Sequence, residues 1–191
     1  MRDTLMLIDI TLKITPKMAK ESSGNRDSSL VGHLGTHFDV MNQEFPLSYT
    51  RRQGIVFDVS AVKERDISTE DVDFDAVAPN TFVAFYTGYI EENEYGTKSY
   101  FASHPQLTHE LIKALVEKGV SVIGLDFGGV RRGKEHVPAD QYCADNGTFV
   151  IENLCNLKTV LDHGNHFIAH TYPMNYVGIT GIPCRVIAEV E

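Results

Sequence analysis

The chain has 191 residues, of which 42% are hydrophobic and 23% charged, a balance typical of a globular protein rather than a disordered chain or a disulfide scaffold. Its formal net charge of -9 argues against broad binding to phosphate backbones, so we expect no nucleic-acid partner. The sequence contains neither a long apolar span nor a secretory pattern, which predicts a cytoplasmic protein with no membrane partner and one domain over residues 1–191.

Runs of aliphatic, β-branched and aromatic residues between turn residues predict the strands. In chain order the runs cover residues 5–12, 54–59, 81–87, 120–126, 148–152, 167–170 and 185–190. The runs at 54–59 and 81–87 are apolar almost throughout, which predicts strands buried on both faces. A polar loop is expected at 20–29, close to the motif described below.

Helices are predicted at fewer places. The clearest covers residues 107–119, where Thr108 is the expected cap and Gly119 the stop. A strand follows it at once, and a second helix-to-strand unit is expected at 141–152, whereas residues 68–71 resemble a helix start. Many strands with few helices predict an α/β fold, namely a single domain around a mixed β-sheet.

One segment carries three metal-ligand side chains, His33, His37 and Asp39, at spacings of four and two. In an extended strand side chains alternate between faces, so this spacing would direct all three the same way. Two imidazoles and a carboxylate supply about the ligand set of a hydrolytic metal site, with positions left open for water. The segment predicts a metal site, the alternative being that Asp39 only caps or hydrogen-bonds local backbone.

Two further carboxylates, Asp126 and Glu152, end otherwise apolar strands. A carboxylate removed from water is costly unless it is paired, hydrogen-bonded or metal-bound. A turn contact is the favoured interpretation for Asp126, and metal binding for Glu152. For His163, His166 and His170, a polar loop is favoured over a second metal cluster, because the intervening glycine breaks a helix.

Together these residues resemble the cyclase family of metal-dependent hydrolases, which includes bacterial kynurenine formamidase (arylformamidase) and isatin hydrolase. That family carries the motif HxGTHxDxPxH, which is matched here by His33, Gly35, Thr36, His37 and Asp39. Matches to family patterns occur in order at residues 8–10, 54–59, 87–89, 119–120, 123–126, 146–147, 152–154, 156–157 and 181–185. The resemblance therefore covers nearly the whole chain.

The resemblance implies a swivelling β/β/α fold, a homodimer or higher homo-oligomer, and a zinc or manganese site that activates water to hydrolyse an amide bond. His33, His37 and Asp39 would be metal ligands. Glu152 matches the glutamate that helps to hold a second ion in binuclear members. The family histidine twelve positions earlier falls on Asp140, a harder oxygen ligand that would favour manganese or magnesium, or abolish the second site.

The motif itself departs from the family at two positions. Its proline falls on Met41, and its final histidine, implicated as a ligand or catalytic base, falls on Gln43. Glutamine cannot accept a proton at neutral pH, although Gln43 could still orient water or substrate. The remaining candidates for the general base are metal-activated water, Glu152, Asp140, His136 and His170.

The favoured prediction is a metal-dependent hydrolase that cleaves an amide bond of a small molecule. It would be arylformamidase-like or would open a cyclic amide. A role in tryptophan catabolism is one option. Glu152 and Gln43 are its predicted catalytic residues. A second hypothesis is a catalytically degenerate family member that binds metal or a small ligand without turnover. A third is a structural subunit whose acidic surface serves assembly with a partner.

Overall fold

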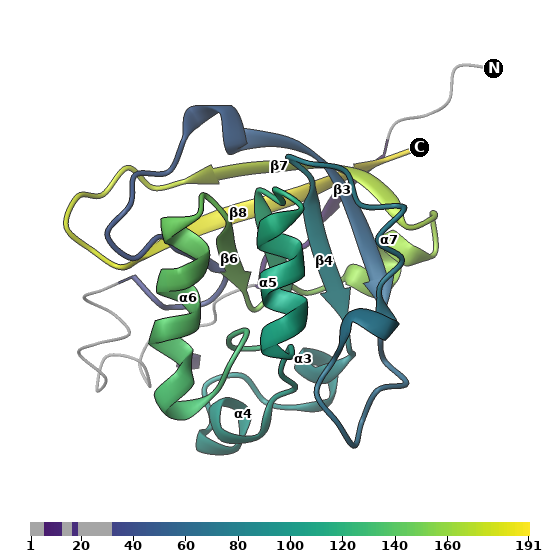
Figure 1. Cartoon of the computed structure of the whole chain (residues 1–191), viewed down its shortest axis with the longest axis horizontal. Helices are drawn as coiled ribbons and strands as arrows, with labels where there is room; N and C mark the ends of the chain where they lie inside the picture. Colours follow the sequence, from purple (N-terminus) through teal and green to yellow (C-terminus); the bar gives the residue numbers. More distant parts are fainter. Residues whose placement is uncertain (1–5, 13–16, 19–31) are drawn as a thin grey trace.

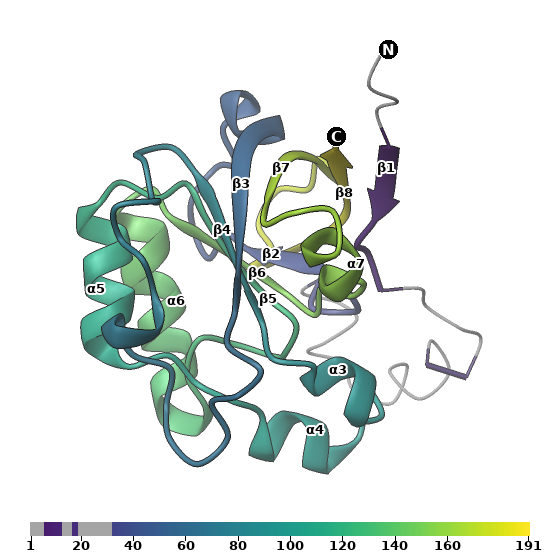
Figure 2. The same cartoon turned by 90° about the vertical axis from the view of Figure 1, so that its right-hand side faces the viewer.

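The computed structural model describes residues 6–12, 17–18 and 32–191, so the loop expected at 20–29 lies outside the described residues. Within these ranges one eight-stranded sheet runs in the order β1-β8-β2-β6-β5-β4-β3-β7. Because β7 also pairs with β8, seven strands close into a barrel and β1 is added at its side (Figures 1 and 2). The strands are β1 (Met6–Asp9), β2 (His37–Asp39), β3 (Arg51–Asp58), β4 (Phe82–Tyr86), β5 (Val122–Leu125), β6 (Phe149–Glu152), β7 (His166–Pro173) and β8 (Gly181–Val190).

The predicted mixed sheet is confirmed, with β3, β4, β5 and β6 parallel to one another and β2 antiparallel to both β6 and β8. The α-helices are α3 (Tyr89–Glu92), α4 (Lys98–Ser103), α5 (His109–Glu117), α6 (His136–Asp145) and α7 (Leu157–Leu161). Short 3-10 helices are η1 (Leu47–Thr50), η2 (Thr69–Asp71) and η3 (Gly133–Glu135). None of the helices in the described ranges is long and apolar enough to cross a membrane.

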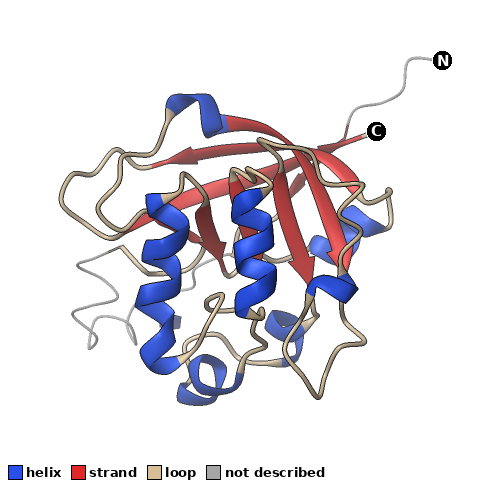
Figure 3. Cartoon of the chain, in the orientation of Figure 1, coloured by secondary structure: helices blue, strands red, loops and turns tan. Residues whose placement is uncertain are grey.

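Helices α5 and α6 lie side by side against one outer face of the barrel (Figures 2 and 3). Side chains of β4 alternate between two cores: Phe82 and Ala84 join the cluster inside the barrel, while Val83 and Phe85 join the cluster under the helices. This alternation follows from the two-residue period of a strand. It explains why the run at 81–87 is apolar almost throughout, as predicted for a strand buried on both faces.

The bounds predicted for α5 agree with the structure better than those predicted for α6. In α5 the side chain of Thr108 accepts a hydrogen bond from the Leu111 N–H, and Gly119 follows the helix with a φ of 77°, as expected of a cap and a stop. Helix α6 begins at His136, five residues before the predicted start. A proline disrupts the interior of a helix. Pro138, however, lies in the first turn of α6, where its missing N–H needs no helical partner.

Candidate metal centre

Strands β2 and β6 present the predicted metal ligands on the face that α6 covers. Phe38 of β2 and Ile151 of β6 point into the barrel, so their neighbours along each strand point outward. His37 and Glu152 are direct partners in the antiparallel register, which places them side by side on that outer face. The site therefore lies between the sheet and the helical layer.

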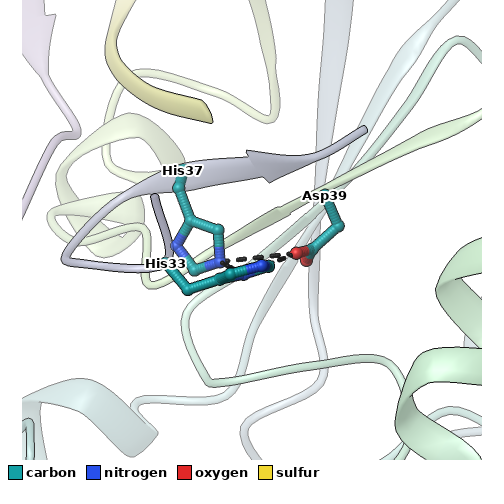
Figure 4. A group of neighbouring side chains, drawn as sticks. All are labelled: His33, His37 and Asp39. Atoms are coloured by element: carbon teal, nitrogen blue, oxygen red, sulfur yellow. Dashed lines mark hydrogen bonds and ion pairs between the residues drawn. The ribbon is translucent and has the colours of Figure 1, made fainter. Parts of the chain in front are cut away.

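The extended strand expected from His33 onward begins only at His37, so the prediction for residues 33–36 was wrong. Gly32 and Gly35 have φ values of 83° and 72°, and these left-handed residues bend the chain. The bend brings the His33 ring edge-on to the His37 ring, with centroids 4.8 Å apart (Figure 4). The three side chains still converge, although a turn rather than strand alternation brings His33 to the others.

The donor atoms of the three predicted ligands are spaced like those around a metal ion. His33 Nδ1 lies 3.0 Å from both His37 Nε2 and Asp39 Oδ1, and His37 Nε2 lies 3.5 Å from the same oxygen. Ligands bound about 2.1 Å from an ion stand about 3.0 Å apart in octahedral and about 3.4 Å apart in tetrahedral geometry. Little movement of the side chains would be needed to hold a divalent cation.

A hydrogen bond from one ring nitrogen fixes the orientation of each of the two motif histidines. His37 Nδ1 donates to the Gly35 carbonyl at 2.9 Å, which leaves Nε2 of the neutral ring free to bind an ion. His33 Nε2 is hydrogen-bonded to the Thr180 hydroxyl at 2.9 Å. The His33 ring lies against Gly181, where a Cβ atom would come within 2.8 Å of it, so only glycine leaves room for the ring.

Helix α6 closes the other side of the site. Its inward stripe contains Ala139, Asp140, Cys143 and Ala144, and Asp140 is the polar member. His136, one turn earlier, reaches the same region, with Nε2 3.3 Å from Asp140 Oδ2. Glu152 Oε2 lies 3.5 Å from His37 Nε2, and Asp140 faces His136. Metal binding by Asp140 and Glu152 stays a prediction.

The carboxylates of this cluster meet the test of a cation site. Both oxygens of Asp39, Oδ1 of Asp140 and Oε1 of Glu152 are buried and have no hydrogen-bond partner. Buried oxygens are rarely left unpaired, because the lost hydration costs free energy. Oxygen and imidazole ligands together suit zinc or manganese, so the residues present fit a divalent metal ion.

Burial and mutual repulsion perturb the titration of these groups. Burial raises the pKa of Glu152 well above its usual value, and the charge of Asp39 and then of Asp140 raises it further. The pKa of Asp140 is raised by burial and by Asp39. Burial acts against ionisation of Asp39 too, but His37 and His33 outweigh it and hold its pKa below the usual range. Asp140 and Glu152 therefore resist ionisation beside Asp39, and a cation bound among the three would favour their charged forms.

Asn153, which was not predicted as a site residue, lies on the far side of the Gly35 carbonyl from His37 and supports the site. Its side-chain amide donates to the Gly35 carbonyl, the same oxygen that accepts from His37, and its Oδ1 accepts from the Tyr100 hydroxyl at 2.8 Å. Asn153 has a φ of 60°, a conformation that asparagine tolerates better than most residues. The available signal was an asparagine directly after the buried Glu152.

Other predicted residues lie apart from this cluster. The Gln43 side chain is exposed, and its amide donates to Asn42 and to Asp145 at the far end of α6. Its catalytic role stays a prediction. His170 pairs with Glu189 at 3.0 Å across the β7–β8 pair, which separates it from the predicted ligands.

Comparisons with known proteins place the chain in a family. The fold and site define an α/β barrel with a candidate divalent-metal centre, and the family model described as "Putative cyclase" matches residues 8–131. The chain belongs to the cyclase family. No curated protein matches the sequence significantly.

Solved structures confirm the fold class. One titled a potential metal-dependent hydrolase with cyclase activity has 22% identity and a TM-score of 0.78, covering 98% of this chain and 99% of its own. A predicted metal-dependent hydrolase from Bacillus stearothermophilus has 21% identity and a TM-score of 0.76, with the same coverage. Isatin hydrolase A from Labrenzia aggregata has 18% identity and a TM-score of 0.74, covering 97% of this chain and 94% of its own.

Proposed function

We propose that this protein is a metal-dependent hydrolase that cleaves an amide bond of a small molecule and uses zinc or manganese. The observation that carries the proposal is the set of buried, unpartnered carboxylate oxygens that face imidazole nitrogens at 3.0–3.6 Å. Membership of the cyclase family and the fold shared with hydrolases support it. An arylformamidase-like or cyclic-amide substrate is the finer form of the proposal.

Each residue of the site has a proposed task. His33, His37 and Asp39 hold the ion, which when bound polarises a carbonyl and lowers the pKa of water to about 7. Glu152 is a further ligand or the general base, because its Oε1 has no hydrogen-bond donor and is free to take a proton. Asp140 adds negative charge on the α6 side. A homodimer or higher oligomer and a cytoplasmic location complete the proposal.

The test is hydrolysis of a panel of formanilides, isatin-like rings and lactams by the metal-stripped protein and after return of zinc or manganese. We expect metal-stimulated activity on at least one class, and a loss of about 1,000-fold in His37→Ala, since a ligand that holds the ion is removed. His109→Ala is the matched control, because His109 is exposed on α5. No stimulation across the panel, or full activity in His37→Ala, would contradict the proposal.

The position of Gln43 favours the second candidate, a family member that binds metal or a ligand without turnover. Gln43 replaces the family base, and its side chain is hydrogen-bonded to Asp145 rather than to the predicted ligands. If this candidate is right, the native protein is inactive on the panel and Gln43→His gains activity. The candidate is excluded if the native protein is active and Gln43→His does not raise that activity.

A further inference from the structure

A cavity of about 420 Å³ lies where the loops after three parallel strands come together. Its walls come from segments 62–66 after β3 and 87–93 after β4, from Arg132 after β5, and from residues 103–106 at the end of α4. Because β3, β4 and β5 are parallel, their carboxyl ends share one edge of the sheet, on the side where α3 and α4 lie in Figure 1. Ligands of parallel sheets commonly bind at this edge. None of the lining residues is a predicted metal ligand.

The first polar group that lines the cavity is the buried imidazole of His104. His104 is 2% exposed, and its ring stacks on Phe127 with the centroids 5.6 Å apart. Its Nδ1 donates to the Pro105 carbonyl at 2.6 Å, whereas its Nε2 has no hydrogen-bond partner among the described residues. Burial lowers the pKa of His104 to about 4, and the charge of Arg132 acts in the same direction, so the ring is neutral at pH 7. Nε2 therefore offers a lone pair to an N–H or O–H donor.

The second group is the guanidinium of Arg132, which pairs with no carboxylate in the part of the chain that the structure describes. Its side chain donates from Nη1 to the Ala102 carbonyl at 3.2 Å. The nearby carboxylate of Asp66 is 2.7 Å from Arg131 Nη1 instead. Nε and Nη2 of Arg132 are thus left to bind an anion, which a guanidinium holds through two parallel hydrogen bonds.

The charges around the cavity limit what that anion can be. The other two cations in its walls have acidic partners: Lys63 pairs with Glu92 at 3.5 Å, and Arg65 pairs with Asp71 at 2.6 Å. Arg132 is therefore the one lining cation without an acidic partner among the described residues. A single unpaired positive charge matches a carboxylate better than a phosphate dianion.

We propose that this cavity binds a small carboxylic acid that also carries a hydroxyl or ammonium group. Arg132 binds the carboxylate, and Nε2 of His104 accepts a hydrogen bond from the hydroxyl or ammonium group. The ligand would thereby satisfy a buried nitrogen that the fold leaves without a partner. The inference does not depend on the proposed function, because it uses none of the predicted metal ligands.

The experiment follows the His104 ring by nuclear magnetic resonance. The full chain, with nitrogen-labelled histidine, is titrated with L-lactate, L-alanine and propionate, which differ only in the group beside the carboxylate. We expect a saturable shift of the His104 Nε2 signal with lactate, alanine or both, and weaker binding of propionate, which has no donor there. Whether lactate or alanine binds more tightly identifies the donor as hydroxyl or ammonium.

Two variants test the two groups separately. Arg132→Gln removes the charge and should lower the affinity at least about tenfold, whereas Arg51→Gln, an exposed control on β3, should keep the native affinity. His104→Phe can still stack on Phe127 but lacks the acceptor, so all three acids should bind it equally weakly, as followed through the Arg132 backbone amide. Circular dichroism checks that the variants fold. If His104→Phe does not, the three acids on the native protein carry this test.

Three results would overturn the proposal: no saturable shift with any acid, propionate binding as tightly as the other two, or native affinity in Arg132→Gln. Binding that is lost in His37→Ala would overturn it as well, because the acid would then be at the metal centre. None of these results changes the expected metal-stimulated hydrolysis, so the cavity and the proposed function are tested independently.

Discussion

Asp126 and Asp39 are both carboxylates at 1% exposure beside the ends of strands, yet their surroundings are opposite. Asp126 accepts three hydrogen bonds, from the Thr87 N–H at 2.8 Å, the Thr87 hydroxyl at 2.6 Å and the Gly88 N–H at 2.7 Å. Neither oxygen of Asp39 accepts one. The first carboxylate joins two loops through residues 87–88, rather than making the local cap or turn contact predicted within residues 126–129, and the second is available to a ligand.

The contrast shows how to separate structural from functional buried charge in this fold. A carboxylate that satisfies backbone N–H groups contributes to stability by giving those donors a partner. A group of carboxylates without donors costs stability, because each loses hydration and repels the others. A divalent cation bound among these carboxylates would offset that cost.

The largest expected effect is that of Asp39→Asn on metal affinity. A binding free energy of about 10–16 kcal/mol shared among four ligands amounts to about 2.5–4 kcal/mol each, or a loss of roughly 70- to 1,000-fold. Because His33 and His37 hold the pKa of Asp39 below its usual range, ionised Asp39 contributes to stability, so we expect the metal-free variant to unfold at a lower denaturant concentration than the native protein. Calorimetry with Mn²⁺ and urea unfolding measure the two quantities.

The matched variant at the other carboxylate is Asp126→Asn, which keeps the shape and an acceptor oxygen. It should leave the affinity for Mn²⁺ at the native value. If Asp126→Asn weakened metal binding as much as Asp39→Asn does, the two carboxylates would not have separate roles.

The next largest effect is the dependence of the free energy of unfolding on pH, through the carboxyl group of Asp126. Burial raises the pKa of Asp126 to about 6 from 3.8 in the unfolded chain, despite its hydrogen bonds with Thr87 and Gly88. The folded state therefore holds the proton more tightly, so the contribution to stability is complete below about pH 4 and is lost as pH rises through 6. A shift of about 2 units corresponds to about 3 kcal/mol.

The measurement is the free energy of unfolding of the metal-free native protein and of Asp126→Asn between pH 4 and 7. Asp140 and Glu152 also have raised pKa values, but they are present in both proteins, so the difference between the two curves isolates Asp126. We expect that difference to shrink by about 3 kcal/mol across this range. Parallel curves would show that Asp126 does not titrate there.

Much of this arrangement could be predicted from local sequence. The strand at 148–152 and the helix after Thr108 carry their signals within a few residues, as apolar runs, caps and glycine stops. The convergence of His33 and His37 was predicted for the wrong reason, because a bend at Gly35 rather than strand alternation brings the two rings together. A turn built on left-handed glycines leaves no periodic pattern from which its path can be read.

What the sequence did not reveal depends on contacts between distant segments. The pairing of His37 with Glu152 joins residues 115 positions apart, and no local pattern specifies that register. The closure of the sheet by β7 and β8 is likewise a tertiary contact. His136 was named only as one possible base, because its proximity to Glu152 depends on how α6 packs on β6.

The smallest expected effect tests Asn153, which joins the two regions. Its N–H donates to the carbonyl of Phe127, the residue after Asp126, and its side chain donates to the carbonyl of Gly35, on which His37 depends. Asn153→Gly preserves the left-handed backbone, since glycine adopts positive φ freely, and removes only the side chain. We expect the affinity for Mn²⁺ to fall about tenfold, as for other residues that orient a metal ligand.

Asn156→Gly is the matched control for that prediction. Asn156 has a φ of 58°, and its exposed side chain donates to the Asp9 carbonyl, so the change in backbone and composition is the same. Calorimetric titration should give the native affinity for this variant. An equal loss of Mn²⁺ affinity in both variants would mean that Asn153 supports the fold in general. A loss confined to Asn153→Gly would mean that Asn153 positions His37 through the Gly35 carbonyl.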